Sequence, residues 1–332
     1  MDAKAKNNQY NNLGGPFPGS RPPIGMNRPG SPGGPFPGGR PPFPMPVEGV
    51  DFLPTQAIPQ FADLPYAAVS PAQKLDLYLP RGQGPFPLVL LVHGGGFMFG
   101  DKADPITKSG TDQLLDRGYA VANINYRLSG EAKAPAQIWD VKTAVRWLRA
   151  HAQEYHLDPA HFGAWGGSAG GSLAAMLGTS CGVTELEGAE LGYPDESSQI
   201  QAVVDWFGPI DFLKMDEQFA GFPEAQTHDA PDSPESVLIG APIQTFPDGA
   251  KLVNPITYIS PSSAPFLIQH GTADRNVPPQ QSKMLYDALE GAIGEKNVTL
   301  TLLEGAGHGG GPQFWSPGNI EIVLSFLDKY LK

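Results

Sequence analysis

One serine in this chain lies in a pattern that is typical of a catalytic nucleophile. Ser168 is the centre of GGSAG at residues 166–170, which matches G-x-S-x-G. An apolar run at residues 162–165 precedes it and a run of small residues follows it, which is the strand–turn–helix context of this motif. Small neighbours let the strand and the helix approach each other at a very tight turn. A glycine-rich turn with an incidental serine is the alternative, so Ser168 needs partners elsewhere in the chain.

Two residues downstream of Ser168 are candidates for these partners. A serine hydroxyl is a weak nucleophile, so a base must take its proton and an acid must orient that base. Asp274 is the first carboxylate after the predicted strand 264–270, and His308 follows the predicted strand 297–303 in a glycine-rich loop. Both lie just past the carboxyl ends of strands, where sites gather in open α/β sheets. The order serine, acid, histidine predicts that these three residues form a catalytic triad.

Each of these partners has a simpler interpretation. Asp274 is also typical of a turn, and a histidine among glycines is also typical of a surface loop. Glu304 competes as the acid, but it lies only four residues before His308 on the same loop. That position suits it poorly for orienting the histidine from a separate strand end. The joint occurrence of all three residues in the right order favours catalysis.

A second glycine-rich motif, HGGG at residues 93–96, follows the apolar run 88–92. During acyl transfer a negative charge develops on the former carbonyl oxygen, and backbone N–H groups must already point towards it. The motif predicts an oxyanion hole made by the N–H groups of Gly95, Gly96 and Ala169. A phosphate-binding loop is the alternative, but no Lys-Ser/Thr pair follows these glycines.

Aromatic residues beside these motifs are candidates for the wall of a substrate pocket. Phe97 directly follows the oxyanion motif, and Trp206 and Phe207 stand at the end of the predicted strand 200–206. Aromatic side chains at strand ends also commonly belong to the core, so simple packing is the alternative for all three.

Apolar runs and amphipathic segments alternate along most of the chain. Strands are predicted at residues 73–79, 88–92, 119–126, 162–165, 200–206, 264–270 and 297–303, and helices at 104–117, 135–155, 278–292 and 319–331. This alternation favours a mostly parallel, doubly wound α/β sheet. Arg127 and Asp140 are predicted to pair and to brace the sheet. Residues 207–262, with one short helical stretch at 234–239, are predicted to form substrate-binding loops or a lid.

Composition narrows the classes of function. The chain has 332 residues, of which 40% are hydrophobic and 17% charged, and this suits one large globular domain or two small ones. A net charge of −12 argues against nucleic acid or an anionic membrane as the main partner. The only cysteine, Cys181, allows neither an internal disulfide nor a cysteine metal cluster. No apolar run approaches the ~18–20 residues of a membrane span. No signal peptide is visible, so a cytoplasmic location is expected, although a secreted protein that has lost its leader would look the same.

Residues 1–47 differ from the rest of the chain. They hold 12 of the 36 prolines and 9 of the 41 glycines, and they repeat GGPFPGSRPP (14–23) as GGPFPGGRPP (33–42). Such a composition favours polyproline II or disorder, so the catalytic domain is expected at residues 48–332. The arm carries five basic residues and one acidic residue, whereas the rest is strongly acidic. It is therefore a candidate to lie on its own body or on that of a neighbouring copy in a homo-oligomer, with a flexible tail as the alternative.

These motifs together resemble those of the α/β-hydrolase serine esterases. The chain is most similar to the bacterial feruloyl-esterase-like group (BD-FAE, a carbohydrate-esterase type), which is related to the hormone-sensitive-lipase family. The resemblance runs from about Lys74 to the C-terminus and rests on KLDLYLP (74–80), LLVHGGGF (90–97), NYRLS (125–129), WGGSAGG (165–171), NPITYIS (254–260), LIQHGTADRNVP (267–278) and GAGHGGG (305–311). Lipase relatives more often carry Asp where this chain has Gly167, and they carry a helical cap where this chain has its Pro/Gly-rich arm.

The resemblance implies an eight-stranded type of sheet in a single catalytic domain. It also implies a serine hydrolase of carboxylic esters that needs no cofactor and no metal. The implied substrates are small-molecule or carbohydrate esters: feruloyl, hydroxycinnamoyl or acetyl esters of plant carbohydrates, or short-chain esters generally. An amidase or peptidase with the same triad is one alternative, and a non-catalytic ligand-binding member of the fold is another.

Overall fold

An eight-stranded sheet forms the centre of the computed structural model, which describes residues 55–222, 224–309 and 311–332. The strand order is β1-β2-β4-β3-β5-β6-β7-β8. The strands are β1 (Phe61–Pro65), β2 (Lys74–Tyr78), β3 (Phe86–Val92), β4 (Ala120–Ile124), β5 (Leu157–Gly167), β6 (Ala202–Trp206), β7 (Phe266–Gly271) and β8 (Val298–Leu303). β2 pairs antiparallel with β1 and with β4, and all other pairs are parallel. The predicted fold class is confirmed, while the arm predicted at residues 1–47 lies outside the described residues.

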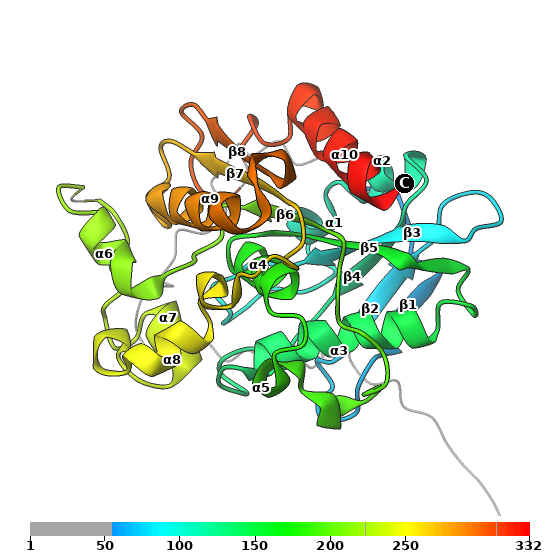
Figure 1. The fold of residues 1–332 in the computed structure, drawn as a ribbon, viewed down its shortest axis with the longest axis horizontal. Coiled ribbons are helices and arrows are strands. Elements are labelled where there is room, and N and C mark those ends of the chain that lie inside the picture. The colour runs from blue at the N-terminus through cyan, green and yellow to red at the C-terminus, as the bar shows by residue number, and fades with distance from the viewer. Residues whose placement is uncertain (1–54, 223, 310) are drawn as a thin grey trace, which may run out of the picture. The chain divides into compact units, whose positions relative to one another are not determined.

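Helices cover both faces of this sheet (Figure 1). They are α1 (Pro105–Lys108), α2 (Thr111–Asp116), α3 (Ala136–Ala150), α4 (Ala169–Thr179), α5 (Thr184–Glu187), α6 (Met215–Gln218), α7 (Pro234–Ile239), α8 (Pro247–Leu252), α9 (Gln280–Ile293) and α10 (Pro317–Leu331). Apolar residues of α2 and α10 share one buried cluster, and those of α3, α4 and α9 share another. The described residues therefore form two cores, one on each face of the sheet.

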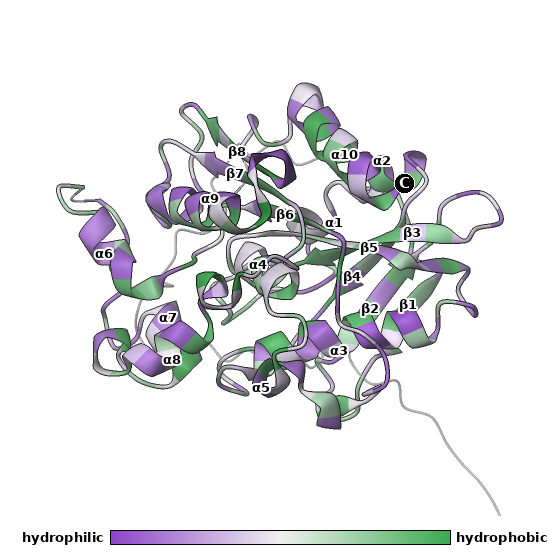
Figure 2. Ribbon diagram, in the orientation of Figure 1, coloured by the Kyte–Doolittle hydropathy of each residue, from purple (hydrophilic) through white to green (hydrophobic). Residues whose placement is uncertain are grey.

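The central strand β3 shows how the sequence produces these two cores. Successive side chains of a strand point to opposite faces. Leu88, Leu90 and Val92 accordingly belong to the cluster under α3 and α4, whereas Val89 and Leu91 belong to the cluster under α10. All five side chains are buried, which explains why the strand reads as an unbroken apolar run. Figure 2 shows the strands in the middle of the molecule mainly in green, with α6 and many connecting loops in purple.

Two predicted helices differ from the observed ones, and one observed strand was not predicted. The helix predicted at 104–117 is two short helices, α1 and α2, because Gly110 between them has φ 86° and packs against the ring of Trp165. The helix predicted at 135–155 ends at Ala150. β1 was not predicted; it is a short edge strand with an irregular register against β2, and its backbone has positive φ at Asp63.

The strand order places the loops after β3 and β5 side by side. β3 lies between β4 and β5, so the direction of chain progression across the sheet reverses at β3. In open α/β sheets, ligands bind outside the carboxyl ends of the strands at such a switch point. Val92 pairs with Gly166 at these carboxyl ends, which brings the HGGG loop next to Ser168.

Residues 207–262, predicted as loops or a lid, contain α6, α7 and α8 joined by short 3-10 turns. Hydrogen bonds attach this segment to α9 and to the loop after β7. The side-chain oxygen of Gln281 on α9 accepts hydrogen bonds from the N–H groups of Ile210 and Asp211, and the N–H of Gln226 donates to the carbonyl of Arg275. The second contact fastens the segment to the loop that carries Asp274. No helix in the described part of the chain has the length and apolarity to cross a membrane.

Candidate active site

Ser168 occupies the sharp turn between β5 and α4. Its backbone angles are φ 56° and ψ −126°, a region that costs a residue with a side chain about 1–3 kcal/mol. A Cβ at Gly166 would lie 2.2 Å from the carbonyl oxygen of Gly170, and a Cβ at Gly170 would lie 2.1 Å from that of Val92. Both positions therefore exclude every residue except glycine. The turn holds the serine in the strained geometry expected of a nucleophile elbow.

The structure brings Ser168, His308 and Asp274 into one hydrogen-bonded chain. His308 Nε2 lies 2.9 Å from Ser168 Oγ, and His308 Nδ1 lies 2.8 Å from Asp274 Oδ2. A carboxylate only accepts hydrogen bonds, so the proton of the neutral ring is on Nδ1 and the Nε2 lone pair faces the serine hydroxyl. This is the tautomer that lets a histidine take a proton from the serine.

Asp274 is fixed and kept ionised by its surroundings. Its side chain is fully buried, and Oδ1 accepts hydrogen bonds from the N–H groups of Asn276 and Val277 at 2.8 and 2.9 Å. Burial acts to raise the pKa of Asp274, but His308 and a second histidine, His270, outweigh it and hold the pKa well below its ordinary value. The carboxylate therefore stays charged over the pH range in which the histidine acts as a base.

The loop after β3 packs against the elbow. A Cβ at Gly94 would lie 2.9 Å from the carbonyl oxygen of Gly167, so the two loops are in direct contact. Gly95 and Gly96 have φ of 106° and 57°, and their N–H groups donate no hydrogen bond to any residue that the structure describes. Ala169 is the first residue of α4, where a backbone N–H has no partner within its helix. Three N–H groups near Ser168 are thus available to a ligand.

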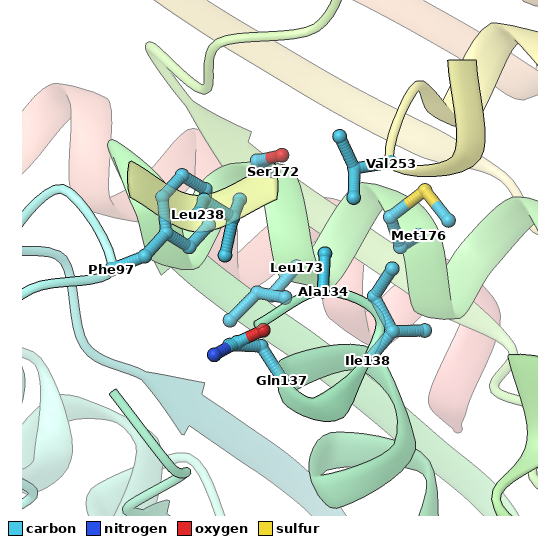
Figure 3. Close-up of a pocket in the computed structure, with 9 residues that line it drawn as sticks. All are labelled: Phe97, Ala134, Gln137, Ile138, Ser172, Leu173, Met176, Leu238 and Val253. Atoms are coloured by element: carbon cyan, nitrogen blue, oxygen red, sulfur yellow. The ribbon is translucent and has the colours of Figure 1, made fainter. Parts of the chain in front are cut away.

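A small, mainly apolar cavity lies one helical turn from the serine (Figure 3). The N–H of Ser172 donates to the carbonyl of Ser168, which fixes this distance along α4. The cavity has a volume of about 10 Å³, roughly the space that one water molecule needs. It is lined by Phe97, Ala134, Gln137, Ile138, Ser172, Leu173, Met176, Leu238 and Val253. Phe97 connects the cavity to the loop after β3, because it directly follows Gly96.

The two other predicted pocket residues do not line this cavity. Phe207 lies beside the site, with its ring 4.8 Å from that of His308 between ring centroids. Trp206 packs in an aromatic cluster with Trp165, Phe314 and Trp315. The indole N–H of Trp206 donates to Gln269. Phe207 is therefore placed to support the histidine, whereas Trp206 has the surroundings of a core residue.

Two buried polar residues beside the triad were not predicted as site residues. His270 Nε2 lies 3.2 Å from Asp274 Oδ2. Its sequence signal is a histidine four positions before the acid at the end of an apolar strand. Asp205 at the end of β6 is completely buried, and this burial raises the pKa of Asp205 to about 6. Among the described residues, no group of three or more His, Cys, Asp or Glu side chains is arranged to hold a metal ion.

Comparison with known proteins shows that the chain is similar to esterases. The BD-FAE family model matches residues 75–289. Esterase LipC of Mycobacterium tuberculosis is 30% identical over 72% of this chain and 57% of its own length. A truncated carbohydrate esterase from gut microbiota is 32% identical over 81% of this chain and 95% of its own, with a TM-score of 0.73. A thermophilic esterase from Thermogutta terrifontis with propionate bound is 26% identical over 80% of this chain and 92% of its own, with a TM-score of 0.61. The chain spans about half the length of the curated relatives it matches.

Proposed function

The chain belongs to the BD-FAE family of α/β-hydrolase esterases, and from this premise we propose that it is a serine carboxylic ester hydrolase. The observation that carries the proposal is the hydrogen-bonded chain from Ser168 Oγ through His308 to Asp274 Oδ2. In this proposal Ser168 is the nucleophile, His308 the general base and Asp274 the orienting acid.

Each step of the reaction assigns one task to these groups. His308 Nε2 takes the proton of the serine hydroxyl while Oγ bonds to the ester carbonyl carbon. The tetrahedral intermediate then expels the alcohol, which receives that proton from His308. Water loses a proton to His308 and attacks the acyl-enzyme, and the acid is released as Ser168 regains its proton. Asp274 stabilises the imidazolium that forms in each half of the cycle without taking up the proton itself.

The N–H groups of Gly95, Gly96 and Ala169 are proposed to stabilise the oxyanion. The negative charge of each tetrahedral intermediate develops on the former carbonyl oxygen, and preformed donors near it lower the barrier. Loss of one such donor costs about 3–4 kcal/mol in comparable sites. The absence of other hydrogen-bond partners for the N–H groups of Gly95 and Gly96 within the described residues supports this role.

The small size of the cavity beside Phe97 favours substrates with a short acyl group. The cavity volume of about 10 Å³, roughly the space of one water molecule, suits the methyl group of an acetyl ester, and longer acyl groups or a feruloyl ring enter only if the walls move. The carbohydrate esterase relative favours an acylated carbohydrate as the alcohol side. We therefore infer that acetyl and other short-chain esters, including those of plant carbohydrates, are better substrates than hydroxycinnamoyl esters.

A substrate panel with an inactive variant tests this function. Hydrolysis of p-nitrophenyl acetate, butyrate and octanoate, methyl ferulate and acetylated xylan should be fastest for the short acyl groups. Ser168→Ala should abolish hydrolysis and labelling by a fluorophosphonate probe. Full hydrolysis by Ser168→Ala contradicts the mechanism, and a wild-type protein that the probe does not label supports a non-catalytic binding role instead. A faster rate on an aminoacyl anilide than on the esters indicates an amidase.

The size of the acyl site has its own test. Leu238→Ala enlarges the cavity and should shift the preference of the enzyme towards longer acyl chains. Leu289→Ala is the matched control, because Leu289 is equally buried in the same core cluster but does not line the cavity. A preference that moves equally in both variants contradicts the assignment of this cavity to the acyl group.

A further inference from the structure

A second histidine contacts the carboxylate that orients His308. His270, the penultimate residue of β7, is completely buried. Its Nε2 lies 3.2 Å from Asp274 Oδ2 and 3.0 Å from the carbonyl oxygen of Val277. On the other side of the ring, Nδ1 lies 2.7 Å from Ser282 Oγ on α9. Both ring nitrogens are therefore used, and one of them reaches the same oxygen that His308 contacts.

The neighbours of His270 determine where its proton lies. The Val277 carbonyl and the Asp274 carboxylate can only accept hydrogen bonds, so Nε2 must carry a hydrogen. In the neutral ring, Nδ1 then accepts the hydrogen bond that the Ser282 hydroxyl donates. The two acceptors at Nε2 thus fix the tautomer of His270, and Ser282 holds the other edge of the ring in place.

Asp274 Oδ2 consequently faces a ring nitrogen of each histidine. The single Nε2 hydrogen of His270 is shared between this oxygen at 3.2 Å and the nearer carbonyl oxygen of Val277 at 3.0 Å. A hydrogen bond to a carboxylate spreads its negative charge and reduces its pull on any other proton. The donor from His270 comes from the sheet, whereas Asp274 and His308 lie on loops. It therefore limits the orientation of the carboxylate as well as its charge.

We propose that His270 is a positioning residue of the hydrolase. It holds the Asp274 carboxylate in its orientation towards His308 and reduces the negative charge of that carboxylate at the oxygen that His308 contacts. This inference rests on the esterase function proposed above. His270 itself touches no reacting atom. Its removal leaves Oδ2 with one donor, which concentrates the negative charge that faces His308 and favours the imidazolium form of that residue.

The titratable groups around His270 come from three parts of the fold. Asp274 and His308 lie on the loops after β7 and β8, and Asp205 lies at the end of β6 and interacts electrostatically with His270. The ring of Phe207 packs against both histidines at 6.4 and 4.8 Å between ring centroids. A test of His270 therefore has to separate its effect from the titration of Asp205.

The pH dependence of hydrolysis tests the proposal. The kcat/KM of wild type, His270→Leu and His270→Gln on p-nitrophenyl acetate is measured between about pH 4.5 and 9, with the active fraction counted by fluorophosphonate titration. His270→Leu should lower kcat about tenfold, with KM little changed. It should also move the acid limb, the low-pH side of the kcat/KM profile on which activity falls, to higher pH by about one unit. His270→Gln, whose amide can donate to Asp274 and accept from Ser282, should restore the position of the limb.

Two further variants keep the test decisive. Ser282→Ala keeps the imidazole but removes the hydrogen-bond partner that holds its Nδ1 edge, and it should move the limb in the same direction by less. Asp205→Asn supplies a background without the neighbouring acid, in which His270→Leu should produce the same shift. The inference is overturned if the limb of both His270→Leu and Ser282→Ala stays in place, or if the shift disappears in the Asp205→Asn background. Retained hydrolysis by Ser168→Ala instead overturns the esterase mechanism itself.

Discussion

Asp205 should make the stability of this protein depend on pH. Its side chain is completely buried at the carboxyl end of β6. Oδ1 accepts one hydrogen bond, from the N–H of Gly208 at 3.0 Å, and Oδ2 has no partner among the described residues. Burial disfavours the charged form and raises the pKa of Asp205 from 3.8 to about 6. The folded protein therefore binds a proton at this site more tightly than the unfolded chain does.

The magnitude follows from the difference between the two pKa values. Each unit corresponds to 1.36 kcal/mol, so a rise from 3.8 to about 6 is worth about 3 kcal/mol. Because the folded pKa is the higher one, the contribution of Asp205 is fully present below the unfolded pKa. It is lost as the pH rises through about 4 to about 6. At neutral pH the folded state holds a buried, incompletely paired carboxylate.

Asp205→Asn removes this titration. The free energy of unfolding of variant and wild type is measured by urea titration with tryptophan fluorescence at about pH 4 and about pH 7.5. The stability of Asp205→Asn relative to wild type should rise by about 2 kcal/mol between these two pH values, because at about pH 4 the unfolded carboxyl is already partly ionised. Any constant effect of the new amide cancels in this comparison. Asp232→Asn, at an exposed position, is the control for the substitution, and a relative stability of Asp205→Asn that does not change with pH would refute the reasoning.

Four other substitutions have outcomes that follow from the structure. Gly170→Ala should abolish hydrolysis and lower the melting temperature, because its Cβ would lie 2.1 Å from a carbonyl oxygen of β3. Gly291→Ala on α9 meets nothing within 4 Å and should stabilise the fold by about 0.5–1 kcal/mol in urea titration. Asp140→Ala leaves the buried Arg127 guanidinium without its bidentate partner and should cost about 3–5 kcal/mol of unfolding free energy by the same assay. Asp274→Asn should lower kcat on p-nitrophenyl acetate about 10⁴-fold at unchanged KM.

The sequence was sufficient to place the triad candidates because each is tied to a local pattern. Ser168 stands in a five-residue motif between a strand and a helix, and Asp274 and His308 directly follow apolar strands. In a parallel sheet, strand ends that point the same way meet at one edge. Strand type and chain order alone were thus enough to predict that these residues meet. The predicted pairing of Arg127 with Asp140 is also confirmed.

The features that escaped prediction depend on contacts between distant segments. The helix break at Gly110 reflects its packing on Trp165, which lies on β5. The partner of His270 on α9 is Ser282, and nothing in the strand itself indicates that contact. The aromatic cluster around Trp206 likewise combines β5, β6 and the segment before α10. Hydrophobic periodicity indicates which face of a helix or strand is apolar, but it does not identify the segment against which that face packs.

Gly167, where lipase relatives more often carry Asp, shows how such a contact changes the meaning of a sequence difference. A Cβ at this position would lie 3.2 Å from ring carbons of Phe207, which is tighter than ordinary van der Waals contact. The ring of Phe207 in turn packs edge-on against that of His308. A larger residue at 167 would therefore displace the ring of Phe207, which contacts the histidine. Gly167 and Phe207 form a small–large pair beside His308. The glycine at this position is therefore explained by the packing around the histidine and is not in itself evidence about the substrate.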